Sequence, residues 1–127
     1  MATLLVNTGR AIITNRIKGS GTEPLYVAWG TGAGTTAAAD TTLFTESSTA
    51  TSLGTRTTGT STQQTTTTTN DTYQVIGTMT SNATQTITNA GLFDAVSSGN
   101  LFIKSDFTGV ALLNGDAIQF TIKASFA

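Results

Sequence analysis

The sequence predicts a mainly all-β protein, an antiparallel β-sandwich or jelly-roll-like single domain, with a short N-terminal helix or arm. Three observations favour this fold. Apolar and polar side chains alternate along the C-terminal segment, short turn sequences separate several apolar segments, and Thr, which favours extended backbone, makes up roughly a quarter of the chain. With 127 residues, 38% of them hydrophobic, we expect one domain over residues 1–127, divided into an arm or helix at 1–19 and a sandwich at 20–127.

Residues 7–21, NTGRAIITNRIKGSG, are the best candidate for helical structure. Ala11, Ile12 and Ile17 lie at roughly helical spacing, and Gly19 follows as a typical helix stop. A short helix and an extended arm both fit this pattern.

Two shorter elements are expected in the next part of the chain. Residues 24–30, PLYVAWG, predict a strand that starts after Pro24. Residues 39–46, ADTTLFTE, predict a short helical turn with Asp40 as its N-cap. The Thr-rich residues 55–71 predict one or two exposed strands.

Two hairpins are predicted in the second half. Residues 72–81 and 83–90 form the first, with a bulge at Gly77. Residues 91–96 and 100–107 form the second, closed by the loop from Ser97 to Asn100. In its second strand, alternation places Leu101, Ile103, Ser105 and Phe107 on one face and Phe102, Lys104 and Asp106 on the other.

The last segment carries the clearest strand pattern. Ile118, Phe120, Ile122 and Phe126 alternate with polar residues, and a turn at Asn114 and Gly115 precedes them. The predicted core therefore comprises Ile118, Phe120, Ile122, Phe126, Leu101, Ile103, Leu92 and Val27.

The composition argues against an enzyme. The chain has no His and no Cys, so the commonest general base, the thiol nucleophile and the usual transition-metal ligands are missing. The seven acidic residues are scattered among turns and strand ends: Glu23, Asp40, Glu46, Asp71, Asp94, Asp106 and Asp116. For Asp94 we prefer a turn-forming or capping role to that of an acid in a cleft. We expect no catalytic residue, no cofactor and no metal.

The glycine-rich stretch WGTGAGTT does not match a phosphate-binding loop. The third glycine, Gly34, comes too early for a dinucleotide fingerprint, and no Lys follows it as in a Walker loop. We interpret Gly30, Gly32 and Gly34 as a turning connection. A net charge of −1 favours neither nucleic acid nor a membrane surface as a partner. Residues 1–16 lack the pattern of a secretory signal, so synthesis and folding in the cytoplasm are expected.

The chain resembles the small β-rich virion proteins of tailed bacteriophages, a family of capsid decoration (cement) proteins and tail-fibre-like proteins. The resemblance rests on YVAWGTGAGTTAAADTTLFTES, ITNAGLFDAVSSGNLFIKSDF and the closing NGDAIQFTIKASF. Many relatives carry an acidic residue where this chain has Asn89.

The resemblance implies a structural virion protein on the capsid surface, bound to the major capsid protein as a homotrimer that stabilises the shell. One short segment without fibrous repeats favours this decoration role. The alternatives are a tail or tail-fibre receptor-binding module and, less favoured, a carbohydrate-binding protein that stacks sugars on Trp29 or Tyr26. For Trp29 a place in the core is the preferred interpretation.

The N-terminal segment is the candidate contact surface. Three of the six basic residues precede the first acid, so the chain carries about +3 before Glu23 and about −4 from Glu23 onward. We expect this segment to contact the shell or a neighbouring subunit through Leu4, Leu5, Val6, Arg10, Arg16 and Lys18. A solvated helix edge, whose charges only aid solubility, is the alternative.

Overall fold

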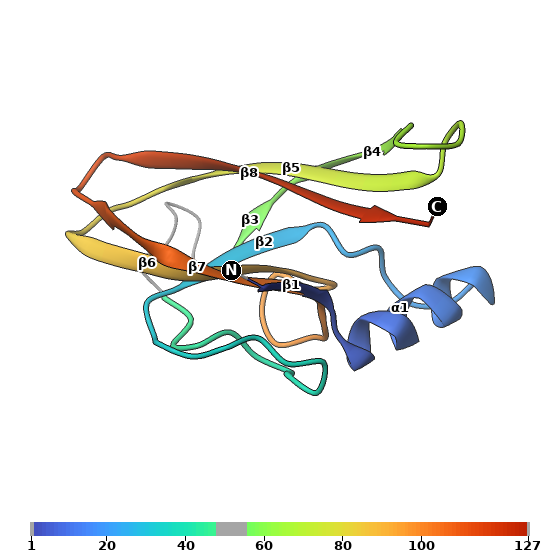
Figure 1. The fold of residues 1–127 in the computed structure, drawn as a ribbon, viewed down its shortest axis with the longest axis horizontal. Helices are drawn as coiled ribbons and strands as arrows, with labels where there is room; N and C mark the ends of the chain where they lie inside the picture. Colours follow the sequence, from blue (N-terminus) through green and yellow to red (C-terminus); the bar gives the residue numbers. More distant parts are fainter. Residues whose placement is uncertain (1, 48–55, 127) are drawn as a thin grey trace.

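The described part of the chain forms two stacked antiparallel β-sheets and one short helix. The structure is a computed structural model and describes residues 2–47 and 56–126. One sheet has the strand order β1-β7-β6-β2-β3 and the other the order β4-β5-β8, and Figure 1 shows them as the lower and upper layers. The predicted all-β sandwich class is confirmed.

The elements are, in chain order, β1 Ala2–Leu5, α1 Asn7–Ile17, β2 Tyr26–Gly30, β3 Thr57–Thr58, β4 Thr60–Gln64, β5 Thr72–Thr80, β6 Gln85–Phe93, β7 Leu101–Leu112 and β8 Ala117–Ser125. The helix that sequence spacing indicated is present, and so are the two short Thr-rich strands, β3 and β4. No helix in this described part is long and apolar enough to cross a membrane.

A glycine just past the end of α1 terminates the helix, as predicted. Gly19 has a φ of 94°, and its N–H and that of Ser20 donate to the carbonyls of Arg16 and Asn15, which is the pattern of a Schellman motif. At the other end, the Thr8 hydroxyl donates to the Leu101 carbonyl at 2.6 Å. The helix is therefore fixed at its start to the beginning of β7 and stands beside the sandwich (Figure 1).

The hairpin of β6 and β7 is confirmed, with an earlier strand end than the sequence indicated. β6 stops at Phe93, and the Asp94 carboxylate accepts the backbone N–H of Asn100 at 2.7 Å across the loop. The capping role expected of Asp94 is confirmed.

The alternation predicted for β7 fails at its first residues. A register shift after Leu92 places Leu101 opposite Phe93 on the outer face of the sheet, whereas Phe102 and Ile103 join the core between the sheets. A bulge of this kind turns a side chain to the other face, which simple alternation cannot anticipate.

The hairpin predicted for residues 72–81 and 83–90 is wrong. β5 pairs with β4 and β8, while β6 pairs with β2 and β7, so the chain crosses between the sheets after Thr80. Ser81 donates its N–H to the Asp116 carbonyl and accepts the N–H of Gly115, both at 2.7 Å. Two crossing connections are thus held side by side at this end of the sandwich.

The bulge predicted at Gly77 is also wrong. Gly77 pairs in regular register with Phe120, and a Cβ there would lie 2.8 Å from Val27 Cγ2 on the opposite sheet. The absence of a side chain at Gly77 therefore lets the two sheets approach closely.

The main core lies between the two sheets. Val27, Leu92 and Ile103 are buried as predicted, with Trp29, which has no exposed surface, at the centre. Ile118, Phe120 and Ile122 on β8 face this core but remain only partly buried.

The prediction that Phe126 belongs to the core is wrong. In the structure 60% of its surface is exposed. Its backbone N–H still bonds to the Asp71 carbonyl, so extended pairing continues past β8. Its side chain lies at a groove beside α1 and is not enclosed between the sheets. Alternation along β8 predicted the face on which the Phe126 side chain lies. It could not predict whether the opposite sheet extends far enough to cover that side chain.

Residues 31–47 cover the outer face of the five-stranded sheet and pass beneath the lower layer in Figure 1. The short helical turn predicted at residues 39–46 is wrong, because this segment is irregular. Asp40 is not a helix N-cap: its carboxylate accepts the N–H of Ala37 at 3.1 Å and the ammonium of Lys104 at 2.8 Å. Between this segment and the sheet lies a second apolar cluster, which consists of Val6, Ala28, Leu43, Phe93 and Leu101.

Candidate functional site

The predicted contact residues divide into exposed and buried groups. Arg10, Arg16 and Lys18 are all exposed on α1 or at its end. Arg10 donates to the Asn7 side chain at 3.1 Å, and Arg16 donates to the Gly21 carbonyl at 3.0 Å. These contacts stay within the N-terminal region, so the charged groups remain accessible to a partner.

The three apolar residues before the helix lie differently. Leu4 is 37% exposed, Leu5 packs against the main core, and Val6 has no exposed surface. β1 pairs with β7 of the same chain, for example Thr3 with Ser105. Val6 therefore stabilises its own fold, and whether the other five residues contact a partner stays a prediction.

An apolar groove runs along one side of α1. It has a volume of about 270 Å³ and is lined by Ile12, Ile13, Arg16, Ile17, Glu23, Pro24, Tyr73, Phe102 and Phe126. Ile17 and Phe126, which are 81% and 60% exposed, are its most accessible apolar side chains. Large apolar side chains that remain in water beside a groove are typical of a contact surface.

The wall of this groove is fixed by Tyr73. Its single hydroxyl hydrogen is shared between the Pro24 carbonyl, at 2.7 Å, and the Glu23 carboxylate, at 3.2 Å. Burial, together with the negative charge of Glu23, raises the pKa of Tyr73 above its ordinary value, so the hydroxyl, which is protonated at neutral pH in any case, also keeps its proton in alkaline solution. The segment after α1 is thereby tied to β5.

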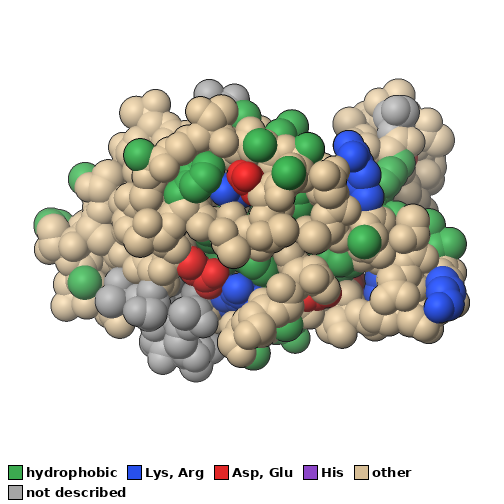
Figure 2. Space-filling model, turned by 90° about the horizontal axis from the view of Figure 1, so that it is seen from below, with side chains coloured by type: hydrophobic (Ala, Val, Ile, Leu, Met, Phe, Trp, Pro, Cys, Tyr) green, Lys and Arg blue, Asp and Glu red, His purple; other side chains and the backbone are tan. Residues whose placement is uncertain are grey.

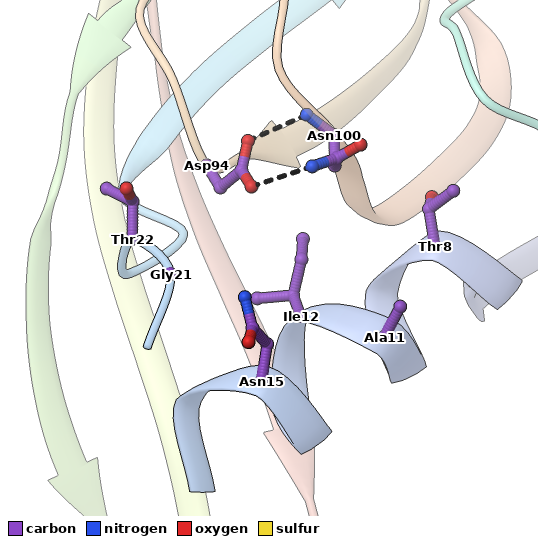
Figure 3. Close-up of a pocket in the computed structure, with 8 residues that line it drawn as sticks. All are labelled: Thr8, Ala11, Ile12, Asn15, Gly21, Thr22, Asp94 and Asn100. Atoms are coloured by element: carbon purple, nitrogen blue, oxygen red, sulfur yellow. Dashed lines mark hydrogen bonds between the residues drawn. The ribbon is translucent and has the colours of Figure 1, made fainter. Parts of the chain in front are cut away.

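A second, more polar pocket of about 250 Å³ lies on the other side of α1 (Figure 3). Ile12 and Asn15 point from the helix toward Asp94, which holds Asn100 through two hydrogen bonds. Thr8, Ala11, Gly21 and Thr22 complete the lining. The Asp94 carboxylate is already engaged by Asn100, so its role at this pocket is to close the β6–β7 loop.

The other acidic residues also hold loops or cations of their own chain. The Asp71 carboxylate accepts the N–H groups of Thr66, Thr67 and Thr68. That of Asp106 accepts the N–H of Thr36 at 2.7 Å. Within residues 2–47 and 56–126, no group of three His, Cys, Asp or Glu side chains is arranged to hold a metal ion.

Sequence reasoning missed two buried cations. Lys104 is 1% exposed and lies 2.8 Å from Asp40 and 3.3 Å above the Phe44 ring. Arg56 is 6% exposed, pairs with Glu46 at 3.0 Å and lies 3.5 Å from the centre of the Phe93 ring. Both cations fix outer segments to the five-stranded sheet, and the position of Lys104 inside an apolar run was the available signal.

The glycine-rich connection packs against this same outer region. A Cβ at Gly30 would collide with the Phe44 carbonyl, and one at Gly34 would lie 2.7 Å from the Phe44 ring. Asn89 holds Phe44 from the sheet, since its amide accepts the Phe44 N–H and donates to the Phe44 carbonyl, each at 3.0 Å. A carboxylate at position 89 could make only the first of these bonds.

The two aromatic residues considered as sugar-stacking platforms already pack against other side chains of this chain. Trp29 lies in the core, as preferred, and packs edge-on against Phe120 with ring centres 6.4 Å apart. Tyr26 packs partly buried against the outer cluster. A stacking platform on Trp29 is therefore excluded in this fold.

Away from α1, where Arg10, Arg16 and Lys18 are exposed, the surface carries little charge. Figure 2, which views the molecule from below, shows few Lys, Arg, Asp or Glu side chains, and much of that face is neutral. Such a surface suits lasting contacts with other proteins better than electrostatic steering.

The sequence was compared with models of known protein families. A family model described as "Podophage GP4 fiber I protein gp80" matches residues 11–125. Neither a curated protein nor a solved structure matches the chain significantly.

Proposed function

Because this chain belongs to the podophage GP4 fiber I protein gp80 family, it is a structural virion protein of a bacteriophage, and we propose that it serves as a subunit of a virion fibre. The observation that carries the proposal is the family match, which extends from α1 to the end of β8. The proposed role is mechanical and includes no catalytic step.

The groove beside α1 supports a contact role of this kind. It leaves Ile17 and Phe126 in water, while its wall is held rigid by the Tyr73 hydrogen bonds. Burial of two large side chains against another virion protein would contribute about 3 kcal/mol or more. Arg16 at the rim would add orientation more than affinity.

A second candidate is the decoration role, in which the chain binds the major capsid protein on the capsid surface, as a homotrimer, through Leu4, Leu5, Arg10, Arg16 and Lys18. The compact sandwich favours this candidate, because residues 2–47 and 56–126 contain no elongated or repeated element. Many copies on a shell would compensate for a weak single contact.

Deletion of the gene from the phage separates the two candidates. A fibre subunit predicts particles that lack a fibre by electron microscopy and adsorb poorly, while the heat stability of their capsids is unchanged. A decoration protein predicts the reverse: normal fibres, with capsids that release DNA at lower temperature. Complementation with the intact gene is the control, and the second result would overturn the fibre proposal.

A further inference from the structure

The two sheets of the sandwich differ in width on the side where β8 lies. β8 is the last strand of the three-stranded sheet, the upper layer in Figure 1, and pairs with β5 in an unbroken register from Thr72–Ser125 to Thr80–Ala117. No other strand of the described residues pairs with its second edge. The five-stranded sheet opposite continues through β7 to β1, so this lower sheet extends past the edge of β8.

The position of Thr3 shows that the inner face of the lower sheet is uncovered here. Thr3 pairs with Ser105 across β1 and β7, and their hydroxyl groups lie 2.8 Å apart. Ser105 lies two residues from Ile103, so both belong to the face of β7 that meets the core. Thr3 therefore points toward the upper sheet, yet it is exposed, because the upper sheet ends at β8.

A cleft of about 270 Å³ occupies the uncovered space. Its large apolar side chains are Ile103 and Phe107 of β7 and Phe120 and Ile122 of β8. The inward side chains of β8 remain partly exposed, whereas Val75 and Met79 on the neighbouring strand β5 have no exposed surface. One more strand beside β8 would cover the side chains of β8 as β8 covers those of β5.

The edge of β8 also lacks the features that usually prevent strand addition. Proline, several charges or a bulge commonly protect such an edge. β8 contains no proline, its register with β5 shows no shift, and Lys123 is its one charged residue. Its unpaired N–H and C=O groups can therefore pair with another strand.

The extent of the lower sheet decides what kind of strand can enter. A strand that fills the cleft must direct its apolar side chains toward β7 and β1. In a folded sandwich those side chains already cover a second sheet about 10 Å away, and that sheet would coincide with β7 and β1. A single extended segment with no sheet behind it needs only the width of one strand, about 4.8 Å, and enters without collision.

We propose that an extended segment of another virion protein inserts beside β8 as an additional antiparallel strand. All pairs of neighbouring strands in the two sheets are antiparallel, so this orientation continues the existing pattern. Large apolar side chains at alternate positions of the segment face Phe107, Phe120 and Ile122, and the residues between them face solvent. The inference goes beyond the proposed function, because it holds whether the chain lies in a fibre or on the capsid.

The charge of the edge defines one further position of the segment. Lys123 lies at the cleft, and within residues 2–47 and 56–126 the two ion pairs involve other cations, Arg56 and Lys104. An acidic residue directly opposite Lys123 would supply a counter-charge and stabilise the pairing. The partner segment therefore combines alternating large apolar residues with a carboxylate.

A tethered strand tests whether the edge accepts such a segment. The strand Thr-Val-Glu-Val-Thr-Val-Gln-Val-Thr, which matches the nine residues of β8, is attached to the C-terminus through a short Gly-Ser linker. Antiparallel pairing places its Glu opposite Lys123 and its Val side chains in the cleft. The matched control carries proline at two adjacent central positions of the tethered strand, since proline cannot donate to the ladder.

Thermal unfolding followed by circular dichroism measures the pairing. We expect the tethered strand to raise the melting temperature by about 5 °C or more over the proline control. Changing its Glu to Lys should reduce this increase by about half, because the new charge opposes Lys123. Adding Lys123→Glu to that variant should restore the increase.

Incorporation into particles tests whether a neighbouring protein uses the edge. Phage that lack the gene are complemented with the wild type, the tethered variant or the proline control, and purified particles are probed with an antibody against the chain. We expect about tenfold less of the tethered variant than of the proline control, because its own strand fills the cleft at high effective concentration. The antibody detects the chain anywhere in the particle, so this result does not depend on the choice between fibre and capsid.

Selective stabilisation by the tethered strand, together with its selective exclusion from particles, supports the proposal. Equal stabilisation by the proline control, or equal incorporation of the two extended variants, would overturn it. Sedimentation of the wild type adds one more outcome. Self-association that the tethered strand abolishes would also overturn the proposal, since the segment would then come from a second copy of this chain and not from another protein.

Discussion

Removing the carboxylate beside Lys104 should destabilise this protein more than removing both charges together. Lys104 is 1% exposed, and its ammonium lies 2.8 Å from Asp40 and 2.9 Å from the Thr42 carbonyl. Asp40→Asn leaves this buried cation without its counter-charge. Lys104→Met removes the cation and keeps a side chain of similar length.

The structure sets the expected size of each effect. Breaking a buried ion pair from one side costs about 3–5 kcal/mol. The Asp40 side chain is 22% exposed, so water reaches this site and we expect about 3 kcal/mol for Asp40→Asn. Lys104→Met should cost about 1 kcal/mol or less, because the remaining carboxylate is partly solvated and still accepts the Ala37 N–H.

Urea unfolding of the two single variants and the double variant gives a double-mutant cycle. The double variant should be about as stable as Lys104→Met alone, and about 2 kcal/mol more stable than Asp40→Asn. Asp116→Asn is the matched control, because Asp116 is exposed and accepts the Leu113 N–H without any cation. If Asp40→Asn costs no more than this control, or if the double variant is as unstable as Asp40→Asn, the reasoning fails.

Three further outcomes are expected. Phe120→Ala should cost about 2 kcal/mol by urea unfolding, below the range for a fully buried Phe, because this side chain is only partly buried against Trp29; no loss would show that it faces solvent. Backbone N–H groups hold the pKa of Asp71 well below its usual value, so its stabilising effect is present above about pH 4 and is lost as pH falls; an ordinary pKa by NMR titration would contradict this. Ile17→Glu should leave the melting temperature unchanged but reduce incorporation into particles, unlike Leu113→Glu at the far end of the sandwich; equal incorporation would remove the α1 groove from the contact surface.

Local patterns predicted the individual elements well. Alternation along β8 and the loop composition between β6 and β7 each depend on neighbouring residues, and both elements are present. The predicted pairing of β5 with β6 is wrong because a turn sequence shows only that the chain reverses. It does not show which sheet the next strand enters. The predicted burial of Phe126 is wrong for a similar reason, since its burial depends on how far the opposite layer extends.

The candidate site was predictable only in part. Arg10, Arg16 and Lys18 stand out in the sequence as basic residues on a helix, and the structure leaves them exposed. The groove itself was not predictable, because it joins α1 to Tyr73 and to Phe126, far away in the chain. The same distance in sequence concealed the partners of Lys104, which come from a segment without regular structure.

A cryo-electron microscopy reconstruction of the intact virion tests the assignment of this chain as a fibre subunit most directly. The chain should be traceable in a fibre, with the groove that carries Ile17 and Phe126 covered by a neighbouring protein. Density for this sandwich repeated over the capsid surface, with no copy in any fibre, would contradict the assignment and favour the decoration role.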